Sequence, residues 1–325
     1  SGDLEGATEL YREVHDVFER TLAPDAPDLV MARQNLAAML VQVGELERAR
    51  ELEEEVLRVR ERTLGPDAPD LQLARLNLAS TLRGLGELEA ARDLEWQVLE
   101  VRARTQPPDS PDLLHARLQL GTTLSSLGES SAARTQLSAA LAGFSRILAE
   151  DHLLVQAART NLAIVLAGQG DFEAARELDE AALASLSRTH PDDHAYLQSA
   201  RVNLAITLRA LGEDDLSDAV RRKVAEVFGR TLHPGDPRLW MARANLVEGA
   251  ARRGDLEGAR RQLSEIQLEL EDLLPPSHPT LLELRTWHAE LLALTGDLRA
   301  AQTLLEALIE DLARALPEDH DVRKV

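Results

Sequence analysis

The sequence predicts an all-α solenoid, in which antiparallel helix pairs stack side by side instead of surrounding one central core. The first observation is a glycine that returns every 42 residues, without insertion or deletion. A period between about 20 and 50 residues is typical of solenoids, because each repeat buries its apolar face only against its neighbours. The recurring positions are Gly2, Gly44, Gly86, Gly128, Gly170, Gly212, Gly254 and Gly296.

Size and composition are the other two observations. A single hydrophobic core stops growing near about 250–300 residues, so 325 residues in one ordinary globule would be unusual. Hydrophobic residues make up 44% of the chain and aromatic residues only 3%. The core is therefore expected to consist of Leu, Ala and Val side chains, which suit closely packed helices.

The second full repeat serves as a template for the elements. Apolar residues at helical spacing over 71–82 predict a first helix, called helix A, which Gly86 closes in a left-handed conformation. Apolar residues from Leu88 to Leu99 continue the helical period and predict a second helix, called helix B. Helices of this length are marginal alone in water, so stacking must supply most of their stability.

The linker between repeats is predicted to hold two helix caps. Asp67 and Asp70 flank a proline ahead of helix A, and an aspartate there is expected to accept a bond from a free first-turn amide. An arginine ends helix B, where it suits the negative end of the helix dipole. That arginine recurs as Arg20, Arg62, Arg104, Arg146, Arg188, Arg230 and Arg314, with Asp272 as the exception.

The resulting count is one leading helix B over about 3–22 and seven A/B pairs, all in a single solenoid domain over residues 1–325. The pairs are expected to begin near Asp28, Asp70, Asp112, Leu154, Ala195, Arg238 and Thr280. The chain opens in mid-repeat and closes over 316–321 with the start of another linker. We therefore expect a fragment of a longer multidomain protein.

Composition also excludes several classes of function. The chain has no cysteine and a net charge of −20, which argues against thiol chemistry and against binding of nucleic acid or anionic membranes. No apolar run reaches the roughly 18 residues of a membrane span. The linker histidines, such as His152 and His194, lie one repeat apart, so no metal, cofactor or catalytic constellation is predicted. We expect a non-enzymatic, cytoplasmic protein.

The repeat motifs resemble those of a known family. The helix pairs, with Asn77-Leu78-Ala79 in helix A and 86–92 at the turn, resemble tetratricopeptide repeats. The 42-residue period and the linker over 65–70 are similar to the kinesin-light-chain-like subfamily, which is common in large bacterial signalling proteins. The resemblance implies a right-handed superhelix without catalytic activity.

In that family the helix A residues line a concave groove, where a ladder of asparagines bonds the backbone of an extended peptide. The matching positions here are Asn35, Asn77, Asn161, Asn203 and Asn245, with Gln119 in the third pair and Trp287 in the seventh. At 100° per residue, Leu36 and Leu40 share the buried face, and Asn35 points away from it. An amide both donates and accepts, as an extended backbone requires. The alternative is that these amides bond a neighbouring helix or water.

Two isoleucines on the same face, Ile164 and Ile206, predict a pocket for an apolar side chain of the partner. The alternative is that both isoleucines lean into the core. Further along, Glu248, Glu283 and Glu290 are expected to make this face acidic.

A second arginine series is unbroken in the seven pairs and is interpreted as structural: Arg33, Arg75, Arg117, Arg159, Arg201, Arg243 and Arg285. Because it shares the buried face, its stem is expected between repeats, with the guanidinium on linker aspartates such as Asp28 or Asp70, or on a helix B carbonyl. Binding of a ligand anion is the alternative.

The sequence therefore predicts a non-catalytic scaffold for a protein or an extended peptide segment, including another domain of the same chain. The alternative is a sensor or autoregulatory array of a larger signalling enzyme, such as a kinase, a nucleotide-binding switch ATPase or a caspase-like peptidase. A fold of this kind hosts many roles, so the choice between them lies outside the repeat pattern.

Overall fold

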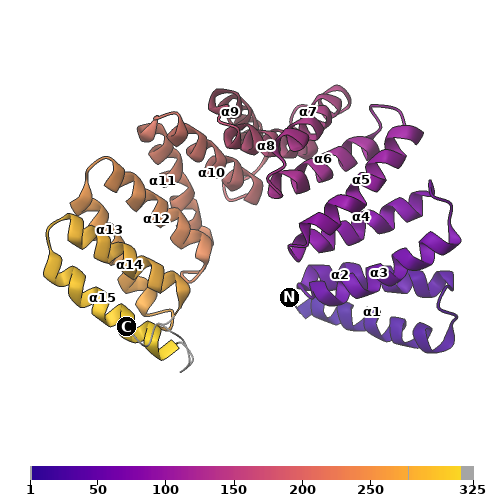
Figure 1. Ribbon diagram of the computed structural model, residues 1–325, viewed down its shortest axis with the longest axis horizontal. Helices are drawn as coiled ribbons and strands as arrows, with labels where there is room; N and C mark the ends of the chain where they lie inside the picture. The colour runs from indigo at the N-terminus through magenta and orange to yellow at the C-terminus, as the bar shows by residue number, and fades with distance from the viewer. Residues whose placement is uncertain (1, 277, 316–325) are drawn as a thin grey trace. The chain divides into compact units, whose positions relative to one another are not determined.

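The computed structural model describes residues 2–276 and 278–315, which form fifteen α-helices and no strand (Figure 1). This confirms the predicted all-α class. Two compact units divide the chain, Ser1–Leu178 and Asp179–Val325. The single domain and the right-handed superhelix stay predictions.

The first unit contains eight complete helices, and each of them from α2 to α8 packs on the helix before it. They are α1 (Gly2–Thr21), α2 (Pro27–Val43), α3 (Leu46–Thr63), α4 (Pro69–Gly84), α5 (Leu88–Thr105), α6 (Pro111–Ser126), α7 (Ser130–Ile147) and α8 (Leu153–Gly168). The next helix, α9 (Phe172–Thr189), crosses the boundary between the units.

The second unit continues with the same order of elements. Its helices are α10 (Ala195–Ala210), α11 (Asp214–Thr231), α12 (Pro237–Arg252), α13 (Leu256–Glu271), α14 (Pro279–Leu294) and α15 (Leu298–Ala315). Every helix A therefore begins within one residue of its predicted start. The predicted closing linker over 316–321 lies outside the described residues.

The recurring glycine ends helix A, as predicted. Each of the seven glycines that follow a helix A has a positive φ, between 76° and 88°. At the first of them, the N–H of Gly44 donates to the carbonyl of Val41 at 3.2 Å, and the N–H of Glu45 donates to Leu40 at 2.9 Å. These bonds satisfy carbonyls that the helix leaves free, and the left-handed conformation they need favours glycine.

The predicted aspartate cap of helix A is wrong in the first repeats. The N-cap residue of α4 is Ala68, so no side chain accepts a bond there. Asp67, one residue earlier, instead accepts from Nη1 of Arg104 at 3.0 Å, and Asp25 accepts from Arg62 at 3.2 Å. Side-chain caps do occur at α8, α12 and α14, where His152, Asp236 and His278 serve.

These pairs also correct the interpretation of the helix B arginine. Arg62, Arg104 and Arg146 bind the aspartate of the linker ahead of their own helix pair instead of capping helix B. Arg20 does bond a last-turn carbonyl, that of Asp16, at 3.0 Å. The side chain of Arg314 lies outside the described residues.

A second row of ion pairs joins the repeats at the other end of helix B. Arg50 lies 2.6 Å from Glu87, and Arg92 lies 2.8 Å from Glu129. In each case the glutamate directly precedes the helix B of the next repeat. All these side chains are partly exposed, so the pairs set alignment more than stability.

The core of each unit is aliphatic. In the first unit it is centred on Phe144, which is fully buried among leucines such as Leu114 and Leu137. In the second unit Trp240 and Ile266 lie in the main cluster. An alanine near the start of most B helices, such as Ala49, has no exposed surface and lets neighbouring helices approach closely. Among the described residues, no helix is long and apolar enough to span a bilayer.

Candidate functional site

The predicted asparagine ladder lies in the middle of the first six A helices, on the side away from the core. Asn35 is exposed, and the other five members are half-buried: Asn77, Gln119, Asn161, Asn203 and Asn245. At Asn161 the alternative is realised, because its Nδ2 donates to Oγ1 of Thr122 on α6 at 2.9 Å. An amide on this face therefore already links successive A helices at one position.

The two isoleucines do not lean into the core. Ile164 and Ile206 are each 46% exposed, at equivalent positions of α8 and α10. Large apolar side chains at this exposure are available to a partner.

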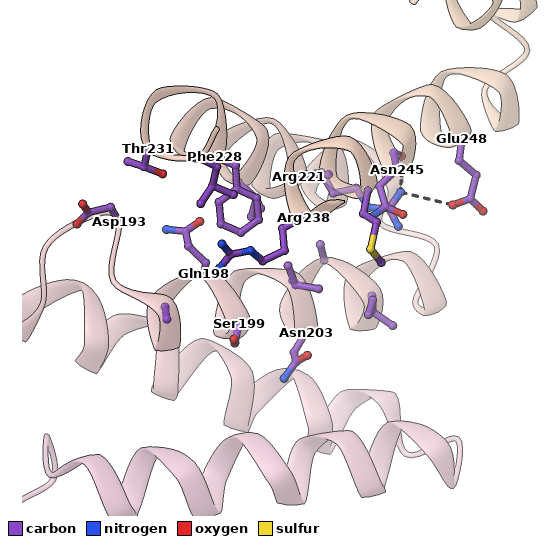
Figure 2. A pocket seen from close by; sticks show the side chains of 18 of the residues that line it. Asp193, Gln198, Ser199, Asn203, Arg221, Phe228, Thr231, Arg238, Asn245 and Glu248 are labelled. Carbon is purple, nitrogen blue, oxygen red and sulfur yellow. Dashed lines mark hydrogen bonds and ion pairs between the residues drawn. The ribbon is translucent and has the colours of Figure 1, made fainter. Parts of the chain in front are cut away.

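The second unit holds a cavity of about 620 Å³ between α10 and α12, with α11 behind it (Figure 2). Three predicted site residues line it together: Asn203 and Ile206 from α10, and Asn245 from α12. The remaining predicted site residues lie elsewhere along the chain. Specific ligand sites are typically clefts of about 300–1,000 Å³ lined by apolar side chains and a few polar groups.

The wall of this cavity is largely apolar. Val202, Ile206 and Met241 are 37%, 46% and 67% exposed and line it from the two A helices. Phe228 and the buried Val224 contribute from α11. Such a surface fits an apolar side chain better than water.

One end of the cavity is charged but internally paired. The guanidinium of Arg209 lies 2.7 Å from Glu248, and Arg252 lies 2.9 Å from the same carboxylate. The buried Arg221 donates to the carbonyl of Asn245 at 2.8 Å, and burial followed by the charge of Arg209 lowers its pKa. Glu248 was predicted to help make this face acidic, but three arginines lie within 4 Å of its carboxylate and offset its charge.

Sequence reasoning missed the α11 side of this site. Arg221 stands where the first two full pairs carry Glu53 and Glu95, so its departure from the repeat was a usable signal. Met241 was also readable, since it occupies the helix A position of Met31. No comparable signal in the repeat pattern marks Phe228.

The arginine series lies with its stems between the helices. Arg33 is 6% exposed; its Nη1 donates to the carbonyl of Pro24 at 2.9 Å, and its Nε lies 2.9 Å from Glu55. Arg201 binds both the carbonyl and the carboxylate of Asp192, at 3.2 and 2.5 Å. Each of these two guanidinium groups therefore contacts both a backbone carbonyl of the linker and an acidic side chain.

The other five arginines have comparable partners. They include Glu61 for Arg75 (3.5 Å), Gln136 for Arg117 (3.0 Å), Glu150 for Arg159 (3.4 Å), Glu269 for Arg243 (2.7 Å) and Asp311 for Arg285 (2.8 Å). Arg243 also lies over the ring of Trp240, 4.9 Å from its centroid. The partners differ from the predicted Asp28 and Asp70, which are exposed.

One group of metal-ligating residues occurs in the described part of the chain: His15, Asp16 and Glu19 on α1. Nη2 of Arg33 lies 3.8 Å from Glu19. Because this buried guanidinium already supplies positive charge, the group is a poor cation site.

Family models described as tetratricopeptide repeat match the sequence over most of its length. The matched residues are 29–70 and 73–112, 112–188 and 153–228, and 240–265 and 282–307. The chain is a tetratricopeptide repeat protein. The predicted family is thereby confirmed.

Solved structures share the fold of this tetratricopeptide repeat protein at low identity. The kinesin light chain TPR-like repeats of Podosopora anserina are 23% identical, with a TM-score of 0.55 over 65% of this chain and 99% of that one. The quorum sensor NprR of B. thuringiensis is 10% identical, with a TM-score of 0.72 over 95% and 83%. The sequence matches no curated protein.

A third structure belongs to a larger signalling protein. It is a Signal Transduction ATPase with Numerous Domains (STAND) from Pyrococcus horikoshii, which carries a tetratricopeptide repeat sensor. It is 16% identical, with a TM-score of 0.64 over 91% of this chain and 43% of that one. These similarities establish the fold. Any inference about the ligand of this tetratricopeptide repeat protein rests on the residues of the chain itself.

Proposed function

We propose that this tetratricopeptide repeat protein is a non-catalytic scaffold that binds an extended peptide or protein segment along helix A. The single observation that carries the proposal is the cavity between α10 and α12. Residues chosen from the repeat pattern alone, Asn203, Ile206 and Asn245, line it together with the exposed Met241.

Binding would use two kinds of contact. An apolar side chain of the partner would enter the cavity and cover Ile206 and Met241, which removes apolar surface from water. The amides of Asn203 and Asn245 would each donate to and accept from the main chain of the partner. Backbone contacts tolerate different sequences, so the apolar anchor would carry most of the specificity.

A second candidate is the sensor or autoregulatory array of a larger signalling enzyme, using the same face. It is supported by the fold shared with the repeat sensor of the Pyrococcus horikoshii ATPase. In this case the occupant is a neighbouring domain of the same polypeptide. The two candidates differ in the occupant and agree on the cavity.

The test selects peptides from a displayed random library on the full chain and then measures the affinity of the selected peptides. Ile206→Glu combined with Asn203→Ala is expected to weaken binding more than tenfold, because a charge then lies in the apolar wall. The matched control is Ile164→Glu, since Ile164 has the same exposed fraction and is not among the residues that line the cavity.

Helical content and the melting temperature should stay unchanged in both variants. Undiminished affinity of the Ile206 variant would contradict the proposal. A library that yields no binder, together with capture of a purified flanking domain, would favour the second candidate.

A further inference from the structure

A buried carboxyl recurs on helix B, opposite a threonine on the next helix A. The two positions are 28 residues apart, and the pairs are Glu53 with Thr81, Glu95 with Thr123 and Asp179 with Thr207. In the third pair, Oγ1 of Thr207 donates to Oδ2 of Asp179 at 2.9 Å. Each pair therefore bridges two successive repeats.

These carboxyls lie deep in the interfaces. Glu53 is 7% exposed, and Glu95 and Asp179 are each 1% exposed. Oε2 of Glu53, Oδ1 of Asp179 and both oxygens of Glu95 have no hydrogen-bond partner among the described residues. A buried carboxylate with unmet lone pairs is costly, whereas a protonated carboxyl has less to satisfy.

The two positions change together along the chain. Where helix B carries Leu137, the next helix A carries Val165 in place of threonine, and both are buried in one cluster. Leu263 and Leu291 form the equivalent pair in the second unit. A hydroxyl is thus found only opposite a carboxyl, which indicates that the two side chains act as a unit.

We propose that these buried carboxyls make the stacking of successive repeats sensitive to pH. Each carboxyl is neutral in the closed interface, and its ionisation near and above neutral pH favours local opening between helix B and the next helix A. The proposal concerns the interfaces between repeats and is independent of the peptide-binding cavity.

The surroundings of the groups support this direction. Burial raises the pKa of Glu53 to about 7 and that of Asp179 to about 6, and it also raises the pKa of Glu95. The threonine hydroxyl opposes this shift for Glu53 and Asp179. Arg83 of α4 faces Glu95, with its Nε 3.6 Å from Oε1. No other charged or titratable group in the described chain shifts these three carboxyls.

The sign follows from proton linkage. A carboxyl whose folded pKa is raised contributes stability that is full below its unfolded pKa and is lost as the pH rises through the folded pKa. For Glu53 that window runs from 4.5 to about 7. A carboxylate whose pKa is lowered on folding has the opposite pH dependence. Arg201 and then Lys223 lower the pKa of Asp192 to about 2, so the stability that this carboxylate contributes is lost only in strong acid. Stacking is therefore tightest between these limits, in mild acid.

The test is amide hydrogen exchange of the full chain at pH 5 and pH 8, corrected for the intrinsic pH dependence of exchange. With pKa values of 4.5 unfolded and about 7 folded, opening of the α3–α4 interface should increase roughly 70-fold between the two pH values. Amides at the α7–α8 interface, which contains Leu137 and Val165, are the internal control and should not respond.

Two variants separate the proposal from a merely structural role of the carboxyl. Glu53→Gln should remove the pH response of α3–α4 and leave that of α5–α6, where Glu95 remains. Glu53→Leu with Thr81→Val copies the natural Leu137–Val165 pair and should fold with protection that is independent of pH. Equal protection of wild-type α3–α4 at pH 5 and pH 8, or an unchanged response in either variant, would overturn the proposal.

Discussion

The turn after α8 offers a test of how the recurring glycine acts, because two glycines lie two residues apart there. Gly168 is the last residue of α8, and Gly170 has a φ of +83°. A Cβ added at either glycine would meet no atom within 4 Å. Substitution by alanine therefore differs between the two sites only in the backbone.

The expected magnitudes follow from that difference. In the left-handed region a Cβ costs about 1–2 kcal/mol, which the lower entropy of the unfolded chain offsets by about 0.4–1 kcal/mol. Gly170→Ala should thus lower the free energy of unfolding by about 1 kcal/mol. Gly168→Ala should raise it by up to about 1 kcal/mol, since alanine is the better helix former. The two variants should differ by about 2 kcal/mol.

Urea unfolding followed by circular dichroism measures the difference, with hydrogen exchange of α8 as a local readout. Gly170→Asn is a third arm, since asparagine visits the left-handed region more readily than alanine and should recover part of the loss. Equal effects of Gly168→Ala and Gly170→Ala would refute the assignment of the glycine to a conformational role.

Three further changes test the packing and the ion pairs. Phe144→Ala removes a fully buried ring and should cost about 3–5 kcal/mol in chemical unfolding. Gly143→Ala should cost about 1–3 kcal/mol, because a Cβ there would collide with Leu114, and a small residue introduced at 114 should relieve the loss. Asp67→Arg should lower the melting temperature slightly at low salt, and adding Arg104→Asp should restore it. If the double variant melted no higher than Asp67→Arg alone, this ion pair would not contribute to the alignment of the helices.

The repeat pattern predicted what every repeat shares. The starts of the A helices, the left-handed glycine turn and the exposure of Asn35 follow from periodicity, which assigns each position one environment in every pair. It failed at the linker, where Asp67 precedes the N-cap by one residue and binds Arg104 at the end of the same helix pair instead. Periodicity assigns an environment to each position and does not specify which side chain of the folded helix pair that position meets.

The cavity shows the complementary limit. Asn203 and Ile206 were identified because they sit at the repeated helix A positions. Arg221 shapes the same cavity from helix B through a departure from the pattern, and a departure does not reveal its consequence in the sequence. Phe228 shapes it without any departure, because Phe18 and Phe144 occupy equivalent positions. The sequence likewise does not reveal that arginines surround Glu248, because these arginines come from three different helices.

The coupling between Glu53 and Thr81 bears on how such a gene could be duplicated or shuffled. A segment cut from one turn glycine to the next, such as 44–85, carries both members of the pair in α3 and α4. A segment cut at the linkers carries the glutamate without its threonine. Inserted ahead of α8, it would bury Glu53 against Val165. Breakpoints at the turn glycines should therefore yield more folded chimeras than breakpoints at the linker prolines, although the prolines lie at the boundaries between helix pairs.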